Sequence, residues 1–229
     1  MTSYVAGPLF LVRAGADLRS GFLTVSHCLA TVAPDTWAIE WVRTPETERL
    51  EEAMRCGIPA ERLPSAVAWV TQRFDRQFAW SHVFLDREAA REFRRLFLPE
   101  DFRLLQIGLA GDAVDKFLAA AAPPPQQPGF APNGATGVYQ ALAGRQALPP
   151  AADRGFEVLG YDSFGGGFDS FRCYAGLEQE FSNLGAAYNQ WGLITDESVA
   201  VKCARLAAEP PGGTCADSWE AWRIVEHAL

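Results

Sequence analysis

The sequence predicts an α+β protein in which a mixed, mainly antiparallel sheet packs against several amphipathic helices. Segments typical of strands are grouped early in the chain, whereas helical spacings of apolar residues occur later, mixed with strands and without strict alternation. The 229 residues are 48% hydrophobic and 21% charged, which is typical of a globular protein that is large enough to bury a core.

Three strands are expected near the start of the chain, where segments rich in β-branched and aromatic residues are separated by Gly, Asp and Pro. They would form an antiparallel meander, and they span residues 4–12, 21–32 and 36–42. A helix should follow, because Thr44 suits the N-cap position and Pro45 the first helical position. Gly57 marks its expected end.

Two amphipathic helices are expected next, because apolar residues recur every three or four positions over 63–78 and over 85–96. A short strand over 80–85 would connect them. The segment 102–109 indicates a buried strand, and Asp112 is expected to cap the helix that follows it.

A proline-rich segment divides the chain, because residues 122–135 hold five of the fifteen prolines and cannot sustain a helix or a central strand. We therefore distinguish an N-terminal α+β part over 1–121, a linker or surface loop over 122–136, and a C-terminal α+β part over 137–229. The two parts either hold separate cores or share one, and we favour the shared core.

Four elements are expected in the C-terminal part. A strand is predicted over 156–161, and an apolar stripe predicts a helix over 170–184 that ends at Gly185. A second helix should run from Thr195 to about residue 208, because acidic residues fill its first turn. The aromatic and β-branched segment 219–226 predicts a final edge strand.

The charge balance narrows the classes of partner. The chain carries 20 Lys and Arg residues against 28 Asp and Glu residues, a net charge of −8. This sign disfavours binding to nucleic acid or to an anionic membrane, and it favours a partner protein with a basic surface. No apolar stretch reaches the roughly 18 residues that a membrane span needs. A homo-oligomer is also compatible with the sequence.

The cysteine pattern indicates the cellular compartment and bears on metal binding. The five cysteines are scattered and never form a CxxC pair, so neither a disulfide framework nor a metal site is expected, and a reducing cytoplasm is the expected location. The scarcity of lysine and the abundance of alanine are typical of a GC-rich bacterial genome. No motif predicts a cofactor.

A glycine-rich turn between the strand over 156–161 and the helix over 170–184 is the most conspicuous local feature. It reads YDSFGGGFDS and lacks both the Gly-Lys-Ser/Thr ending of a phosphate-binding loop and the third glycine of GxGxxG. It is either a flexible turn in which Asp169 or Ser170 caps the helix, or a site for a ligand or partner. The residues assigned to this candidate binding site are Asp162, Gly165, Gly166, Gly167, Asp169 and Ser170.

Three tryptophans, Trp191, Trp219 and Trp222, stand in segments that are expected near the surface. They either form part of a recognition surface, where tryptophan is a common binding hot spot, or pack in the core. An alternative, catalytic interpretation concerns Cys173, which would lie one turn into the predicted helix, where the helix dipole makes a thiol more acidic. His27 is a candidate base for that cysteine.

No motif fixes a reaction, so a binding role is favoured over an enzymatic one. The expected function is that of an acidic cytoplasmic protein that binds a partner with a basic surface. In the more specific version of this hypothesis, the partner is a toxin and the protein inhibits it. In its charge and its lack of catalytic motifs, the chain is similar to bacterial immunity proteins, a similarity of bulk properties that assigns no residue a role. The alternative is a small hydrolase or transferase with Cys173 as nucleophile and backbone N–H groups of the glycine-rich turn as oxyanion donors.

Overall fold

A computed structural model describes residues 2–13, 58–73, 76–79, 83–98, 100, 102–122, 135–163, 167–173, 177–209 and 216–229. The strands expected over 21–32 and 36–42, and the helix expected from Thr44 to Gly57, lie outside these residues. So does most of the proline-rich segment, over 123–134.

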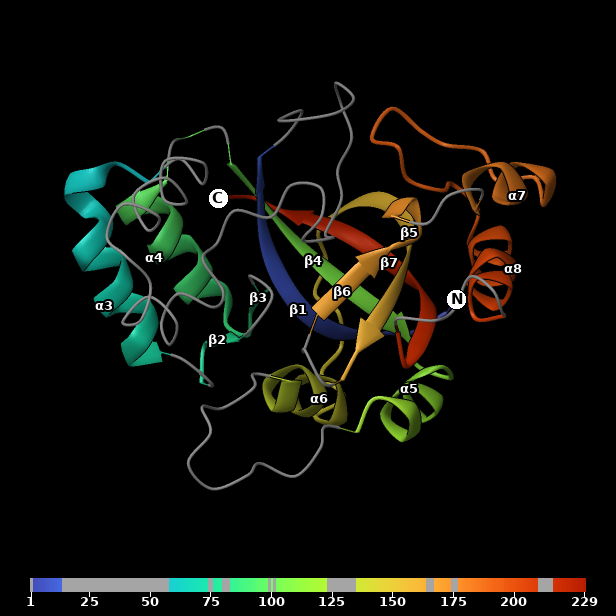
Figure 1. The fold of residues 1–229 in the computed structure, drawn as a ribbon, viewed down its shortest axis with the longest axis horizontal. Helices are drawn as coiled ribbons and strands as arrows, with labels where there is room; N and C mark the ends of the chain where they lie inside the picture. Colours follow the sequence, from blue (N-terminus) through green and yellow to red (C-terminus); the bar gives the residue numbers. More distant parts are fainter. Residues whose placement is uncertain are drawn as a thin grey trace.

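The described residues form a seven-stranded sheet in the order β2-β3-β1-β4-β7-β5-β6, and every pair of neighbours is antiparallel (Figure 1). With the helices described below, this sheet confirms the predicted α+β class. The strands are β1 (Tyr4–Arg13), β2 (Phe78–Ala79), β3 (Val83–Phe84), β4 (Phe102–Ala110), β5 (Ala152–Asp162), β6 (Gly167–Ser170) and β7 (Ser218–His227).

The helical elements are η1 (Ala60–Arg62), α3 (Leu63–Arg73), α4 (Arg87–Phe97), α5 (Val114–Ala120), α6 (Ala135–Ala143), η2 (Phe171–Cys173), α7 (Leu177–Asn183) and α8 (Glu197–Ala207). Carboxylates cap two of them, because Asp86 accepts from Ala89 N at 2.7 Å and Asp196 accepts from Val199 N at 3.0 Å. The expected cap of α5 is wrong, since its N-cap is Ala113, which makes no side-chain hydrogen bond. No helix in the described parts of the chain is long and apolar enough to cross a membrane.

The helix predicted over 170–184 is wrong. Ser170 ends strand β6, the next three residues form the short 3-10 helix η2, and among the described residues of this span only Leu177–Asn183 is α-helical. The apolar stripe misleads because the rings of Phe171 and Phe181 do pack together, at a centroid distance of 4.6 Å, but from two separate elements. The predicted stop is confirmed near Gly185, whose φ of +88° suits glycine.

Strand β7 was expected at an edge of the sheet, but it lies inside the sheet, between β4 and β5. Its burial is almost continuous along the strand, because β5 pairs with one edge, β4 pairs with residues 222–227 on the other edge, and both faces are covered. Strands from before and after the proline-rich segment therefore belong to one sheet.

The sheet curls so strongly that strands far apart in its order meet. Phe10 on β1 and Phe168 on β6 stand with ring centroids 5.8 Å apart, although three strands separate them in the sheet. The inner face carries a core that also contains Trp222 and residues of α5 and α6. Outside the curl, α3 and α4 cover one end of the sheet and α7 and α8 the other (Figure 1).

Candidate functional site

The glycine-rich turn forms the tip of a hairpin between β5 and β6. The ladder pairs Tyr161 with Phe168 and Asp162 with Gly167, so the two strands hold both ends of the turn in fixed positions. Gly165 and Gly166 lie outside the described residues. Side chains alternate along β6, and because Phe168 is buried in the inner core, Asp169 points to the outer face.

A third aspartate, Asp217, joins this hairpin just before β7. Its carboxylate oxygen Oδ2 accepts hydrogen bonds from the backbone N and the hydroxyl of Ser163, at 2.7 and 2.6 Å. Its own backbone N donates to the carbonyl of Tyr161 at 2.8 Å. We call Asp162, Asp169 and Asp217 the acidic hairpin surface.

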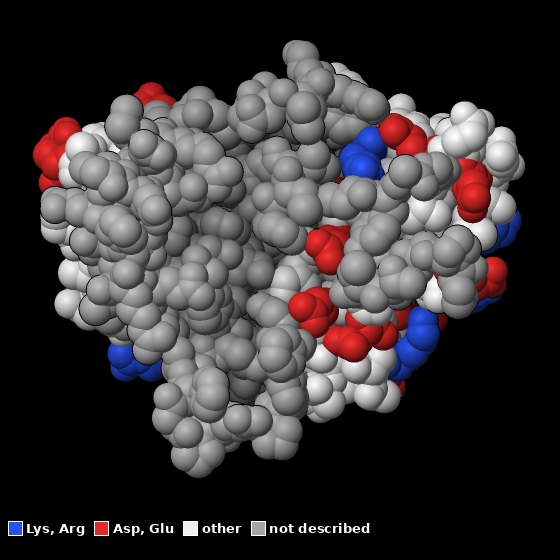
Figure 2. Space-filling view, viewed as in Figure 1, with Lys and Arg blue, Asp and Glu red and all other residues white. Residues whose placement is uncertain are grey.

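Two observations show how the charge of this surface is distributed. Burial raises the pKa of the Tyr161 hydroxyl above its usual value, and the nearby Asp162 and Asp217 carboxylates raise it further. Figure 2, in the same view as Figure 1, shows Asp and Glu side chains grouped around β6 and toward α5. Acidic side chains are therefore concentrated at this end of the hairpin. Asp217 was missed by sequence reasoning because it lies 54 residues from Ser163 in the chain.

Ser170 does not reach the surface and caps no α-helix. Its side chain is fully buried on the inner face, where its hydroxyl donates to Glu157 Oε1 at 3.0 Å. The backbone N of Arg172 donates to the same hydroxyl oxygen at 3.2 Å. Ser170 thus links β6 to β5 inside the sheet, in a position from which it cannot contact a partner protein.

Cys173 is the last residue of the 3-10 helix η2, so it does not occupy the position one turn into a helix over 170–184 that the sequence predicts. Its role as a nucleophile stays a prediction. His27 lies outside the described residues. Cys203 on α8 is a free, buried thiol, and burial raises its pKa to about 11, which disfavours the reactive thiolate.

The expectation that Trp219 and Trp222 lie near the surface is wrong. Their exposed fractions are 2% and 0%, because β7 occupies the middle of the sheet. Trp222 belongs to the inner core, whereas Trp219 belongs to the outer cluster beneath α8. Neither indole lies on the outer surface of the molecule.

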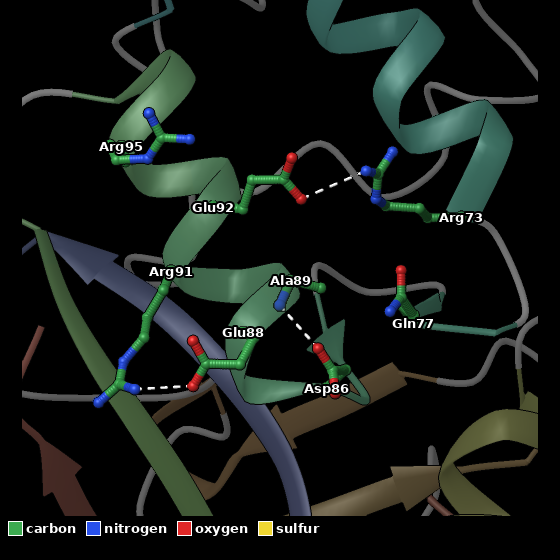
Figure 3. A pocket seen from close by; sticks show the side chains of 8 residues that line it. All are labelled: Arg73, Gln77, Asp86, Glu88, Ala89, Arg91, Glu92 and Arg95. Atoms are coloured by element: carbon green, nitrogen blue, oxygen red, sulfur yellow. Dashed lines mark hydrogen bonds and ion pairs between the residues drawn. The ribbon is translucent and has the colours of Figure 1, made fainter.

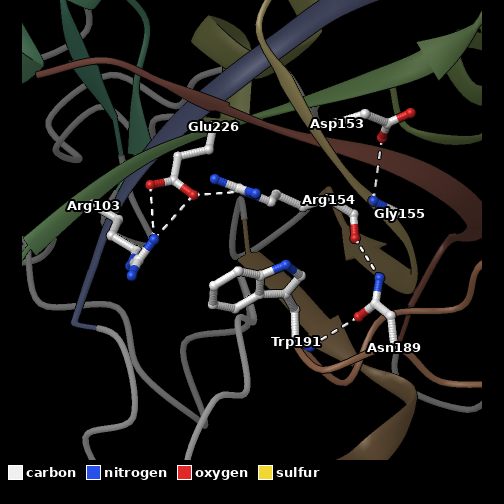
Figure 4. A network of polar contacts seen from close by, with 7 residues as sticks. All are labelled: Arg103, Asp153, Arg154, Gly155, Asn189, Trp191 and Glu226. Atoms are coloured by element: carbon white, nitrogen blue, oxygen red, sulfur yellow. Dashed lines mark hydrogen bonds and ion pairs between the residues drawn. The ribbon is translucent and has the colours of Figure 1, made fainter.

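Trp191 is partly exposed and lies close to two arginines (Figure 4). The guanidinium carbons of Arg103 and Arg154 lie 5.1 and 5.0 Å from the centroid of its ring. Both arginines form ion pairs with Glu226, at 2.9 and 2.7 Å. Asn189 fixes the loop, because its side chain accepts from Trp191 N at 2.9 Å and donates to Arg154 O at 2.6 Å. We call this arrangement the Trp191 stack.

The hollow between α3 and α4 has a volume of about 440 Å³ and a charged lining (Figure 3). Its charges largely neutralise one another, because Arg73 pairs with Glu92 at 3.2 Å and Arg91 pairs with Glu88 at 2.7 Å. The three arginines and three carboxylates of the lining carry no net charge that would select a ligand of one sign. Within the described ranges, no group of three or more His, Cys, Asp and Glu side chains is placed to hold a metal ion.

The acidic hairpin surface thus joins two predicted site residues, Asp162 and Asp169, which are partly exposed, to Asp217, which is exposed and was not predicted. In comparisons with known proteins, no family model, curated protein or solved structure matches the chain.

Proposed function

We propose that the protein binds a partner protein with a basic surface through the acidic hairpin surface. The observation that carries this proposal is the convergence of Asp162, Asp169 and Asp217 at the end of the β5–β6 hairpin. The surrounding charge has the same sign, because residues 135–229 contain 12 acidic and 6 basic residues and so hold −6 of the net charge of −8.

The rigidity of the hairpin supports a binding role. Asp169 stands opposite Gly160 and Asp162 opposite Gly167 in the β5–β6 ladder, so little backbone entropy is lost when a partner docks. A fixed patch of one sign steers an oppositely charged partner and raises the association rate. In its specific form, the proposal is an immunity-type inhibitor that acts on a basic toxin in a bacterial cytoplasm.

Affinity purification of the tagged protein from its native host at moderate salt, followed by mass spectrometry, tests the proposal. We expect one stoichiometric basic protein, whose recovery falls as the salt concentration rises because screening weakens the attraction. Recovery of the tagged protein alone, or together with an acidic partner, would contradict the proposal.

A pair of substitutions then locates the surface. Asp162→Asn combined with Asp169→Asn should slow association with the captured partner severalfold, as measured by surface plasmon resonance. Glu180→Gln combined with Glu209→Gln removes the same charge from exposed positions elsewhere and should have a smaller effect. Equal effects of the two pairs would mean that only the net charge matters and that the hairpin is not the interface.

A further inference from the structure

A pocket of about 540 Å³ lies outside the acidic hairpin surface, between α5, α8 and the start of β7. Its position follows from the strand register. The pairing of β4 with β7 ends at Leu109 and Trp222, but β7 extends back to Ser218. Among the described strands, the residues 218–221 of β7 are therefore paired only on the β5 side, and the pocket occupies the notch on the other side.

The floor of the pocket is apolar and is formed by small side chains beside one indole. Ala110, Ala204, Trp219 and Ala221 contribute to it, and Val201 of α8 stands along its wall. Alanine side chains leave room above the strand edge, and the volume lies within the range of about 300–1,000 Å³ that is typical of small-molecule sites.

Five charged side chains line the pocket, namely Asp112, Lys116, Glu197, Arg205 and Glu220, and Asp112 forms no ion pair with a described residue. Lys116 Nζ and Glu220 Oε1 pair at 2.8 Å, and Glu220 also accepts from the hydroxyl of Ser218 at 3.0 Å, so these two charges are already matched. In contrast, Glu197 and Arg205 form no ion pair with any described residue. The Glu197 side chain accepts a hydrogen bond from the Thr2 hydroxyl at 3.3 Å. Burial raises the pKa of Tyr4 and a hydrogen bond to Asp153 raises that of Arg223, and the charge of Glu197 raises both pKa values further.

The two unmatched charges on α8 are separated along one helix face. Glu197, Val201 and Arg205 follow one another at intervals of four residues on α8, so they line the same side of the pocket. Eight residues of α-helix correspond to about 12 Å along the axis. A single α-amino acid, whose ammonium and carboxylate groups are joined through one carbon, is too short to reach both charges.

We propose that this pocket binds a short peptide of about three residues in extended conformation, with its terminal ammonium group at Glu197 and its terminal carboxylate at Arg205. Three extended residues span roughly 10 Å, which matches the separation of the two charges once their side chains lean inward. The guanidinium of Arg205 can receive a carboxylate through two parallel hydrogen bonds. The peptide backbone pairs with the unpaired edge of β7, as in β-strand addition, and its side chains lie on the alanine floor.

Calorimetric titration with the tripeptide Ala-Leu-Ala and its end-blocked forms tests the proposal. We expect the free peptide to bind, and either N-acetylation or C-terminal amidation to weaken binding roughly tenfold, because each removes one charge-assisted contact. Arg205→Gln should weaken binding of the free peptide by a similar factor and leave the affinity for the amidated peptide unchanged.

Lys202→Gln is the matched control, since it removes a positive charge from the same helix at a position outside the lining of this pocket. Both positions are exposed, so both variants should unfold at the wild-type temperature. The proposal is overturned if the free peptide does not bind at millimolar concentration, if the amidated form binds as tightly as the free one, or if Lys202→Gln weakens binding as much as Arg205→Gln.

Discussion

Replacement of Trp222 by alanine is expected to destabilise the protein strongly. Its side chain is fully buried in the inner core, where it makes edge-on contacts with Phe117 and Phe168 at centroid distances of 5.4 and 5.6 Å. These rings come from α5 and β6, so the indole joins elements that lie far apart in the chain. Its loss would leave a cavity at the centre of the curled sheet.

The magnitude follows from the buried area. A buried aromatic side chain removes about 150–250 Å² from water, which at roughly 25 cal/mol per Å² gives an upper bound of about 4–6 kcal/mol. Measured Trp→Ala costs of about 3–5 kcal/mol include the cavity that remains, so we expect a loss of about 4 kcal/mol. Trp222→Phe should cost less, because Trp222 Nε1 has no hydrogen-bond partner in the structure and phenylalanine retains much of the packing.

Urea unfolding followed by circular dichroism measures this loss as a shift in midpoint at constant slope. Trp191→Ala is the comparison, since Trp191 is only partly buried and should cost distinctly less free energy of unfolding. A Trp222→Ala variant within about 0.5 kcal/mol of the wild type, the usual range for surface substitutions, would refute the placement of this indole in the core.

Two further predictions concern buried polar groups. His227 donates from Nε2 to Gln106 Oε1 at 2.8 Å, and burial, followed by the charges of Arg87 and Arg91, lowers the pKa of its imidazole from its usual value. As the pH falls, the unfolded chain therefore binds a proton at this histidine before the folded protein does, so the free energy of unfolding is highest above about pH 6.5 and declines below it. Between pH 7.5 and 5, the free energy of unfolding should fall less for His227→Gln than for the wild type. The same pH dependence in both proteins would contradict this assignment. Glu226→Gln leaves both arginines of the Trp191 stack without their carboxylate and should lower the free energy of unfolding in urea by about 1–2 kcal/mol. Asp153→Asn breaks a more exposed ion pair with Arg223 and should lower it by less than about 0.5 kcal/mol. Equal losses would argue against a special role of the stack.

Local signals in the sequence were sufficient for several elements. The apolar spacing over 85–96 predicted α4, and the acidic residues around Asp196 predicted the start of α8, because both signals act within a few residues of their own position. The strand β4 was recognised from its largely apolar segment, which reflects burial on both faces. The same local reasoning failed for β7, because an apolar strand at the edge of a sheet and one in its interior differ only in distant partners.

The candidate site likewise contains residues that local sequence signals identified and residues that only the fold brings together. Asp162 and Asp169 were identified because they flank one turn, whereas Asp217 reaches that turn only through the pairing of β5 with β7. Trp191 was singled out as an aromatic residue near the surface, but its neighbours were not foreseeable. Arg103 and Glu226 are 123 residues apart in the chain and meet only because β4 and β7 are adjacent in the sheet.

The position of β7 also sets the order in which the molecule can be completed. β1 and β4 can pair as soon as both have left the ribosome, but β5 and β6 gain a connection to them only when residues 218–227, the last of the described strands, have been made. Until then the nascent chain holds two half-sheets with open edges and an inner core that lacks Trp222. We expect this interval, rather than the finished protein, to be the stage at which the chain is most prone to aggregate and most dependent on chaperones.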